Sequence, residues 1–221
     1  MHLAAEAGSN EAARLLLCQG VSVNSLKHGT WTPLYYAISR NQQAMCELLL
    51  DWPGCDPLAR AAADKNTALN WAAQEGNVAA LRAILQRFPH IDLNVRGPMQ
   101  ATPLLQAASH GKADVARELL KRGANALMRD KGGRTPALAA AMIGDVETIK
   151  VFDRRRLLED RIMAPGMTAF SALHLAAWEG KLEACKAISA IAPHLRKVLI
   201  QGRSPKMVAT LRGHNLVAAV L

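Results

Sequence analysis

The stretch from Ala101 to Pro136 constrains the fold of this chain most, because variants of it fill the whole sequence. Thr102 is a residue type that caps helix N-termini, and Pro103 suits the first helical position, where its missing N–H costs nothing. Apolar residues then follow at helical spacing up to Gly111, a position after the helix where positive φ is expected. A second amphipathic helix ends at Gly123 and a polar stretch follows. The unit is therefore a helix, a turn, a helix and a turn-rich finger.

Three markers recur in one phase along the chain. The hydroxyl residue that opens the first helix returns at intervals of 35, 35, 33, 36 and 33 residues, at Thr32, Thr67, Thr102, Thr135, Ser171 and Ser204. The residue that ends this helix occupies Gly8, Asn41, Gly76, Gly111, Gly144, Gly180 and Gly213. An apolar residue stands eight positions after each of these. One unit cannot cover its own apolar stripes, so the copies are expected to stack on one another.

The chain resembles the ankyrin-repeat proteins, whose unit of about 33 residues carries the signature T-P-L-H-x-A. The signature appears here as MHLAA, TPLYYA, TALNWA, TPLLQA, TPALAA, SALHLA and SPKMVA. The resemblance implies an all-α solenoid of stacked helix-turn-helix units with finger-like hairpin turns. It implies one domain, residues 1–221, with approximate repeats 1–27, 28–60, 61–95, 96–128, 129–164, 165–197 and 198–221, the first and last incomplete. It also implies that Ser171 and His174 bond to each other and to neighbouring backbone.

The usual work of such a solenoid is to bind another protein along its concave side, so the resemblance implies an adaptor for a partner peptide or helix. No nucleotide-binding loop and no nucleophile elbow occurs in the sequence, and His90, His110 and His194 fall in unrelated phases. We therefore predict no catalytic residue, metal site, cofactor or small-molecule substrate. Two alternatives stay open: a substrate-recognition module of a larger enzyme or of a secreted bacterial effector, and, more weakly, a binder of nucleic acid or an acidic surface.

Charge is distributed unevenly. The net charge is +9, yet residues 1–110 carry eight Lys/Arg and eight Asp/Glu, whereas residues 111–221 carry nineteen against ten. One interpretation is a solvated face that keeps the solenoid soluble. The other is an acidic partner that approaches the C-terminal end. Nucleic acid is disfavoured as that partner because the known binding motifs do not occur.

The cysteines predict the compartment of the chain, and its two ends bear on whether it is part of a longer protein. Cys18, Cys46, Cys55 and Cys185 show no CxxC pairing, which predicts buried thiols in a reducing compartment, cytoplasmic or nuclear. Apolar runs stay far short of the roughly 18 residues of a membrane span. We expect no signal peptide, because repeat sequence follows Met1 at once. The open ends of the first and last repeats favour a piece of a longer protein.

Equivalent positions down the stack indicate where a partner would bind. Seven residues after the motif residue, where this family exposes a side chain, the chain has Glu6, Ser39, Gln74, Ser109, Met142, Trp178 and Leu211. The column turns apolar in the last three repeats. We predict an exposed strip of Met142, Ile143, Trp178, Leu211 and Phe170, edged by Arg134, Arg203 and Arg212, as the partner site. A neighbouring segment that covers this strip is the alternative.

The second repeat holds the other candidate for partner binding, the aromatic residue Trp31 in the finger before Thr32. Tyr36 and Trp71 both lie four residues after their motif threonine. We expect them to stack on each other across adjacent repeats, where they fill the seam.

Overall fold

The computed structural model describes residues 1–27, 31–59, 66–153, 157–161 and 170–221. In these ranges the chain is helical, with turns and isolated β-bridges between the helices. The α-helices are α1 (His2–Ala7), α2 (Asn10–Cys18), α3 (Pro33–Ser39), α4 (Gln43–Asp51), α5 (Ala68–Glu75), α6 (Val78–Arg87), α7 (Pro103–Ser109), α8 (Ala113–Lys121), α9 (Pro136–Ile143), α10 (Val146–Val151), α11 (Ala172–Trp178), α12 (Leu182–Ile191), α13 (Pro205–Leu211) and α14 (Asn215–Val220). Short 3₁₀ helices are η1 (Pro98–Gln100), η3 (Leu157–Glu159) and η4 (Pro193–Lys197).

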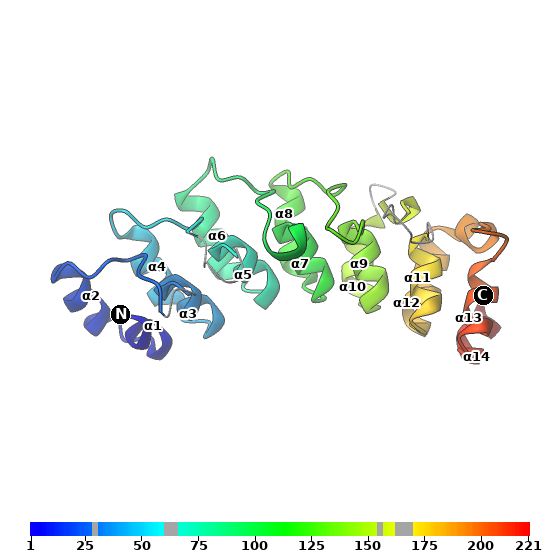
Figure 1. The fold of residues 1–221 in the computed structure, drawn as a ribbon, viewed down its shortest axis with the longest axis horizontal. Helices are drawn as coiled ribbons and strands as arrows, with labels where there is room; N and C mark the ends of the chain where they lie inside the picture. Colours follow the sequence, from blue (N-terminus) through cyan, green and yellow to red (C-terminus); the bar gives the residue numbers. More distant parts are fainter. Residues whose placement is uncertain (28–30, 60–65, 154–156, 162–169) are drawn as a thin grey trace.

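The helices form two layers that run along the whole stack (Figure 1). The first helices of successive pairs contact one another from α1 through α3, α5, α7, α9 and α11 to α13. The second helices do the same from α2 to α14. The predicted all-α solenoid is thus confirmed. One helix pair falls inside each predicted repeat, while the residue boundaries between repeats stay a prediction.

Hydroxyl side chains start most of the first helices, as their residue type predicts. The side chains of Thr32, Thr67, Thr102 and Ser204 each accept a hydrogen bond from the backbone N–H three residues later. This bond satisfies one of the N–H groups that the first turn of a helix leaves unpaired. Ser171 differs because its hydroxyl is used by a neighbouring histidine instead.

That histidine ties the last two repeats together. His174 Nε2 lies 3.1 Å from the carbonyl oxygen of Arg203, and its Nδ1 lies 2.7 Å from the Ser171 hydroxyl. A carbonyl only accepts, so Nε2 donates, and in the neutral ring that burial favours Nδ1 accepts from the hydroxyl. The Ser-x-x-His bonding implied by the sequence is confirmed.

A residue one or two positions after the end of each first helix has a left-handed backbone. Asn41 and the glycines of this series all show positive φ, for example 69° at Gly180 and 76° at Gly213. At the inner glycines the next repeat presses close: a Cβ added to Gly180 would lie 2.7 Å from His214 Nδ1. The glycine therefore supplies both the turn and the room for the neighbouring repeat.

Fingers connect the repeats and bond to one another. Single antiparallel bridges close the fingers at Lys27–Trp31 and Ile200–Arg203, which confirms the hairpin shape. Arg96 Nη1 donates to the carbonyl of Arg129, 3.1 Å away, in the next repeat. Arg129 in turn donates to the Arg161 carbonyl and forms a two-bond ion pair with Asp160 at 2.7 and 2.8 Å. This arginine series holds the fingers of the central repeats in register.

Aromatic side chains across the first two seams follow one pairing. Tyr35, three residues after its motif threonine, packs on Trp71, four residues after the next one, with ring centroids 4.6 Å apart. The predicted pairing of Tyr36 with Trp71 is wrong, because positions three and four face each other across a seam. Tyr36 meets His2 and Trp31 instead.

Cys46 and Cys185 are buried in the stack, whereas Cys55, also expected to be buried, is half-buried. Burial raises the pKa of the Cys46, Cys55 and Cys185 thiols to about 12, so these groups stay protonated. Cys18 is exposed, which corrects the expectation of a buried thiol there. It lies at the end of α2, on a turn that the rest of the stack leaves open to solvent.

The glycine column makes a direct prediction. Gly180→Ala places a methyl group against the His214 ring in a left-handed position, and we expect it to lower the free energy of unfolding by about 2–4 kcal/mol. Gly213→Ala is the matched control, because it has similar φ but no atom within 4 Å, and it should cost about 1 kcal/mol. Urea unfolding followed by circular dichroism measures both. Equal losses would contradict the close approach.

His174 predicts a pH dependence. Burial lowers its pKa below the ordinary 6.5, because the charged ring would be desolvated. The unfolded chain therefore binds a proton more readily, so stability is present above pH 6.5 and is lost as the pH falls below it. Between pH 7 and 5, wild type should lose more free energy of unfolding than His174→Gln. Parallel pH profiles for the two proteins would contradict this role of the ring.

Candidate protein-binding face

The predicted strip maps to the ends of three first helices. Met142 and Ile143 end α9, Trp178 ends α11 and Leu211 ends α13. Ile143 is 47% exposed and Leu211 is 65% exposed, whereas Met142 and Trp178 are half-buried against the core. In repeat five, the side chain eight residues after the motif threonine is therefore more exposed than the side chain seven residues after it.

Phe170 does not belong to the exposed part of the strip. It is only 8% exposed, because its ring stacks on His174 with centroids 5.6 Å apart and touches Trp178 at 5.7 Å. The expected exposure of Phe170 is thus wrong, and its ring packs against Trp178 instead.

Arg212 covers the other side of Trp178. Its guanidinium carbon lies 4.4 Å from the indole centroid, a cation–π contact across the last seam. Arg203 is also exposed at this end, where its backbone bonds to Ile200 and its carbonyl also bonds to His174. Phe170, Trp178 and Arg212 thus form a stack that leaves one part of the indole at the surface.

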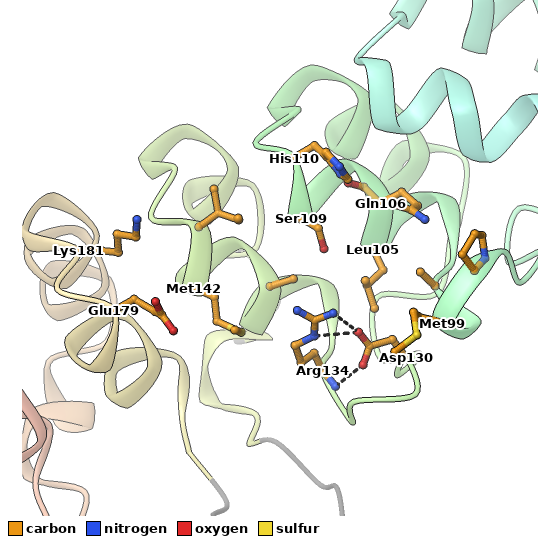
Figure 2. Close-up of a pocket in the computed structure, with 14 residues that line it drawn as sticks. Met99, Leu105, Gln106, Ser109, His110, Asp130, Arg134, Met142, Glu179 and Lys181 are labelled. Carbon is orange, nitrogen blue, oxygen red and sulfur yellow. Dashed lines mark hydrogen bonds and ion pairs between the residues drawn. The ribbon is translucent and has the colours of Figure 1, made fainter. Parts of the chain in front are cut away.

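A groove of about 440 Å³ lies beside the strip, across three repeats (Figure 2). One wall comes from the fingers, with Met99, Asp130 and Arg134. The floor comes from α7 and α9, and the far end from the turn after α11. Besides Pro98, Ala101 and Ala139, the lining residues are Met99, Leu105, Gln106, Ser109, His110, Asp130, Arg134, Met142, Ile143, Glu179 and Lys181.

The charge of Arg134 is largely matched inside the groove wall. Asp130, almost fully buried, accepts bonds from Nη2 and Nε of Arg134 at 2.6 and 2.8 Å, and from its backbone N–H at 2.9 Å. Figure 2 shows this pair on the finger below Leu105. Arg134, predicted as a free rim charge, therefore holds the finger in shape. Glu179 and Lys181 stand at the opposite end of the groove.

Trp31 lies apart from this groove, in the finger before α3. It is 36% exposed and stacks on Tyr35 with centroids 5.0 Å apart. Tyr35 continues to Trp71, so the aromatic side chains form a run across the second and third repeats. The structure does not bring Trp31 together with the predicted strip.

Several groove residues were missed from the sequence. Met99 lies in η1, a finger segment that the comparison of columns skipped, and it is 61% exposed. Gln106 lies in the column of Tyr36 and Trp71, which the sequence analysis compared only for these two aromatic residues, and Lys181 lies in a column that it did not compare. Only the finger and the helices of three repeats together define the groove, so one column could not reveal it.

Comparison with known proteins finds the same repeats in a family model and the same fold in a solved structure. A family model described as ankyrin repeats (3 copies) matches residues 1–61, 53–130 and 104–194. The crystal structure of the ankyrin repeat domain of Bcl-3, described as a unique member of the IkappaB protein family, has a TM-score of 0.76 with this chain. That match has 23% sequence identity and covers 97% of this chain and 96% of that chain.

A curated relative is much longer than this chain. The transient receptor potential cation channel subfamily A member 1 homolog of Caenorhabditis elegans is 28% identical over 172 residues. The match covers 77% of this chain but only 14% of the relative. Within the ranges that the structure describes, no helix has the length and apolar character to cross a membrane. The same ranges contain no group of three or more His, Cys, Asp and Glu side chains placed to hold a metal ion.

Trp178 and Ile143 should respond differently to truncation. Trp178→Ala removes an indole that packs on Phe170 and Arg212, and we expect the free energy of unfolding to fall by about 2 kcal/mol. Ile143→Ala changes a side chain that is half in solvent and should cost less than about 1 kcal/mol. Chemical unfolding of both variants gives the comparison. A Trp178→Ala protein as stable as wild type would show that the indole is not part of the seam.

Proposed function

The chain belongs to the ankyrin-repeat family, and from this we propose that it is a scaffold that binds a partner protein through the groove. Ankyrin repeats are in general protein–protein interaction modules, and solenoids of this kind bind along extended concave surfaces. The groove and the ends of α9, α11 and α13 supply such a surface here. The proposed role needs no catalytic residue and no cofactor in this chain.

The observation that carries the proposal is the open apolar rim of the groove. Met99 and Ile143 stand on it from different repeats and are 61% and 47% exposed. Exposed apolar side chains with a polar surround commonly mark interaction sites. Trp178 adds a partly open indole in the next repeat, and tryptophan is enriched among the residues that dominate binding energy.

The exposed cations of repeat seven suggest which residues flank the apolar anchors of the partner. Arg203, Lys206 and Arg212 are exposed at the last repeat, and none of them has an ion pair with a carboxylate in the described part of the chain. Acidic residues on the partner would complement these cations and raise the rate of encounter. We therefore propose a partner with apolar anchors for the groove and acidic residues toward repeat seven.

The relative supports a role as a recognition module. This chain resembles 14% of a much longer channel homolog, so a similar stack works there inside a larger protein. We propose that the present repeats select a partner for other parts of a longer protein in the same way. The protonated thiols of Cys46, Cys55 and Cys185 fit a reducing compartment, cytoplasm or nucleus, which we propose as the site of action.

A comparison of matched variants tests the groove. Ile143→Asp puts a charge on the rim, whereas Leu127→Asp makes the same change at a side chain that is 62% exposed and does not line the groove. In pull-downs from lysate, we expect a protein retained by wild type and Leu127→Asp to be lost with Ile143→Asp. Retention should survive a rise in salt, because the anchors are apolar.

Other results would contradict the proposal. Equal retention by both variants would move the site away from the groove, and Trp31→Ala would then test the aromatic run of the second repeat. Capture of nucleic acid alone, lost steeply as salt rises, would instead favour phosphate binding.

A further inference from the structure

Two matching turns follow α4 and α6, which are neighbours in the layer of second helices (Figure 1). Each turn begins with an aromatic residue and a proline. The N–H of Cys55 bonds to the Trp52 carbonyl, and the N–H of Ile91 bonds to the Phe88 carbonyl, both at 3.1 Å. Proline suits the second position of such a turn, because its fixed φ is the one required there. Repeats two and three therefore leave their second helices in the same way.

These turns are additions to the regular repeat. Repeat four spans 33 residues between motif threonines and has no such turn, whereas repeats two and three span 35. Arg96 and Arg129 both stand six residues before the next threonine, so the extra residues of repeat three lie before its finger. In repeat four, α8 still packs against the second helices on both sides. Stacking alone therefore does not account for the added turns.

A cavity of about 580 Å³ lies between the two turns. Residues 55–58 and 87–91 line it, and most of them are apolar. Phe88 and Ile91 are half-buried and Pro89 is exposed, so the cavity opens to solvent. It shares no residue with the groove of Figure 2, because first helices and fingers build the groove, whereas this cavity lies where two second helices end.

The walls of the cavity are fixed by bonds between repeats. Arg87 Nη2 lies 2.8 Å from Asp51 Oδ2, an ion pair that joins the ends of α6 and α4. The Asn24 side chain accepts from the Asp56 N–H at 3.0 Å and donates to the Gly54 carbonyl at 2.7 Å. These contacts tie the turn of repeat two to both of its neighbours. A site shaped before binding loses little conformational entropy when a ligand arrives.

The surroundings of the cavity are acidic, although the chain as a whole has a net charge of +9. Asp56 and Asp92 are exposed, one directly after each turn. Their carboxylates accept the N–H groups of Leu58 and Asn94 at 2.8 Å, and neither has an ion pair within the described ranges. The arginine in the lining is already paired. A ligand with a positive charge beside an apolar group is therefore complementary.

We infer that this cavity is a second binding site, for a partner segment that inserts one aromatic or leucine side chain and carries Lys or Arg beside it. Asp92 lies outside the lining, so a ligand must extend beyond the cavity to meet both carboxylates, as a peptide chain does. The inference goes beyond the proposed function, because this site is separate from the groove and selects the opposite charge. The chain thus binds two different segments at once.

The probe is a library of random peptides displayed on phage and selected against the full 221-residue chain. Selected peptides are sorted by loss of binding to Ile91→Ala, which shortens a lining side chain, or to Ile143→Asp in the groove. Leu127→Ala is the control for Ile91→Ala, because Leu127 is 62% exposed and lines neither site. Circular dichroism and thermal melting check that each variant is folded.

A second pair of variants tests the charge. Asp56→Asn/Asp92→Asn removes both carboxylates and keeps an oxygen that can accept the same backbone N–H groups. Asp114→Asn/Glu147→Gln removes two exposed carboxylates away from both sites and is the matched control. Dissociation constants of labelled peptides are measured by fluorescence anisotropy at low and at high salt.

We expect one class of peptides to lose about tenfold in affinity with Ile91→Ala and nothing with Ile143→Asp or Leu127→Ala. These peptides should share an aromatic residue or leucine next to Lys or Arg. Asp56→Asn/Asp92→Asn should weaken them about threefold at low salt and less at high salt, because salt screens exposed charges. The control pair should leave their affinity unchanged.

Three results would overturn the inference. A selection that yields peptides dependent on Ile143 but none on Ile91 would remove the second site and leave the proposed function standing. Peptides that need Ile91 but bind Asp56→Asn/Asp92→Asn as well as wild type would contradict the basic flank. In a parallel screen of small apolar compounds, binding that needs Ile91 while no peptide does would show a small-molecule site instead.

Discussion

Close contact between repeats depends on one backbone position, the left-handed residue that follows each first helix by one or two positions. At Gly144 and Gly180 a Cβ would lie 2.8 and 2.7 Å from the side chain of the following repeat, so the absence of a side chain sets how near two repeats come. That distance brings positions three and four of adjacent motifs together, as in Tyr35 and Trp71. This close approach lets the apolar faces of adjacent repeats stack. The stability of the solenoid depends on that stacking, because each repeat contacts only its neighbours.

Each first helix has one part that packs against the neighbouring repeats and another part that faces solvent. In α7, for example, the Thr102 hydroxyl caps the first turn and the helix packs against the first helices on both sides, so its beginning and middle are committed to structure. Its last turn is freer, since Ile143 and Leu211 can face solvent without loss to the seam. Trp178 is the exception, because Phe170 and Arg212 hold its indole between two repeats. Binding through Trp178 would therefore also act on the strength of the last seam.

The sequence predicts what repeats and misses what depends on neighbours in space. The cap residues and the positive φ of Asn41 follow from residue type at a fixed spacing, and the bond between Ser171 and His174 follows from the family resemblance. Phe170 could not be placed in this way, because its burial comes from His174 and Trp178 rather than from its column. Arg134 is similar: only the structure shows that Asp130 takes up its charge. The groove escaped prediction because three repeats and a finger must come together to form it.

A groove shared by three repeats ties recognition to stacking. Its floor combines α7 and α9, while its wall is a finger whose shape depends on Asp130 and Arg134 and whose position depends on Arg129 and Asp160. A change in any of these contacts would move the wall relative to the floor without touching a lining apolar residue. Solenoid repeats interact only with their neighbours, so such a change would stay local to repeats four to six. If the groove binds the partner as proposed, recognition is a property of a few adjacent seams, and the remaining repeats contribute by holding those seams in line.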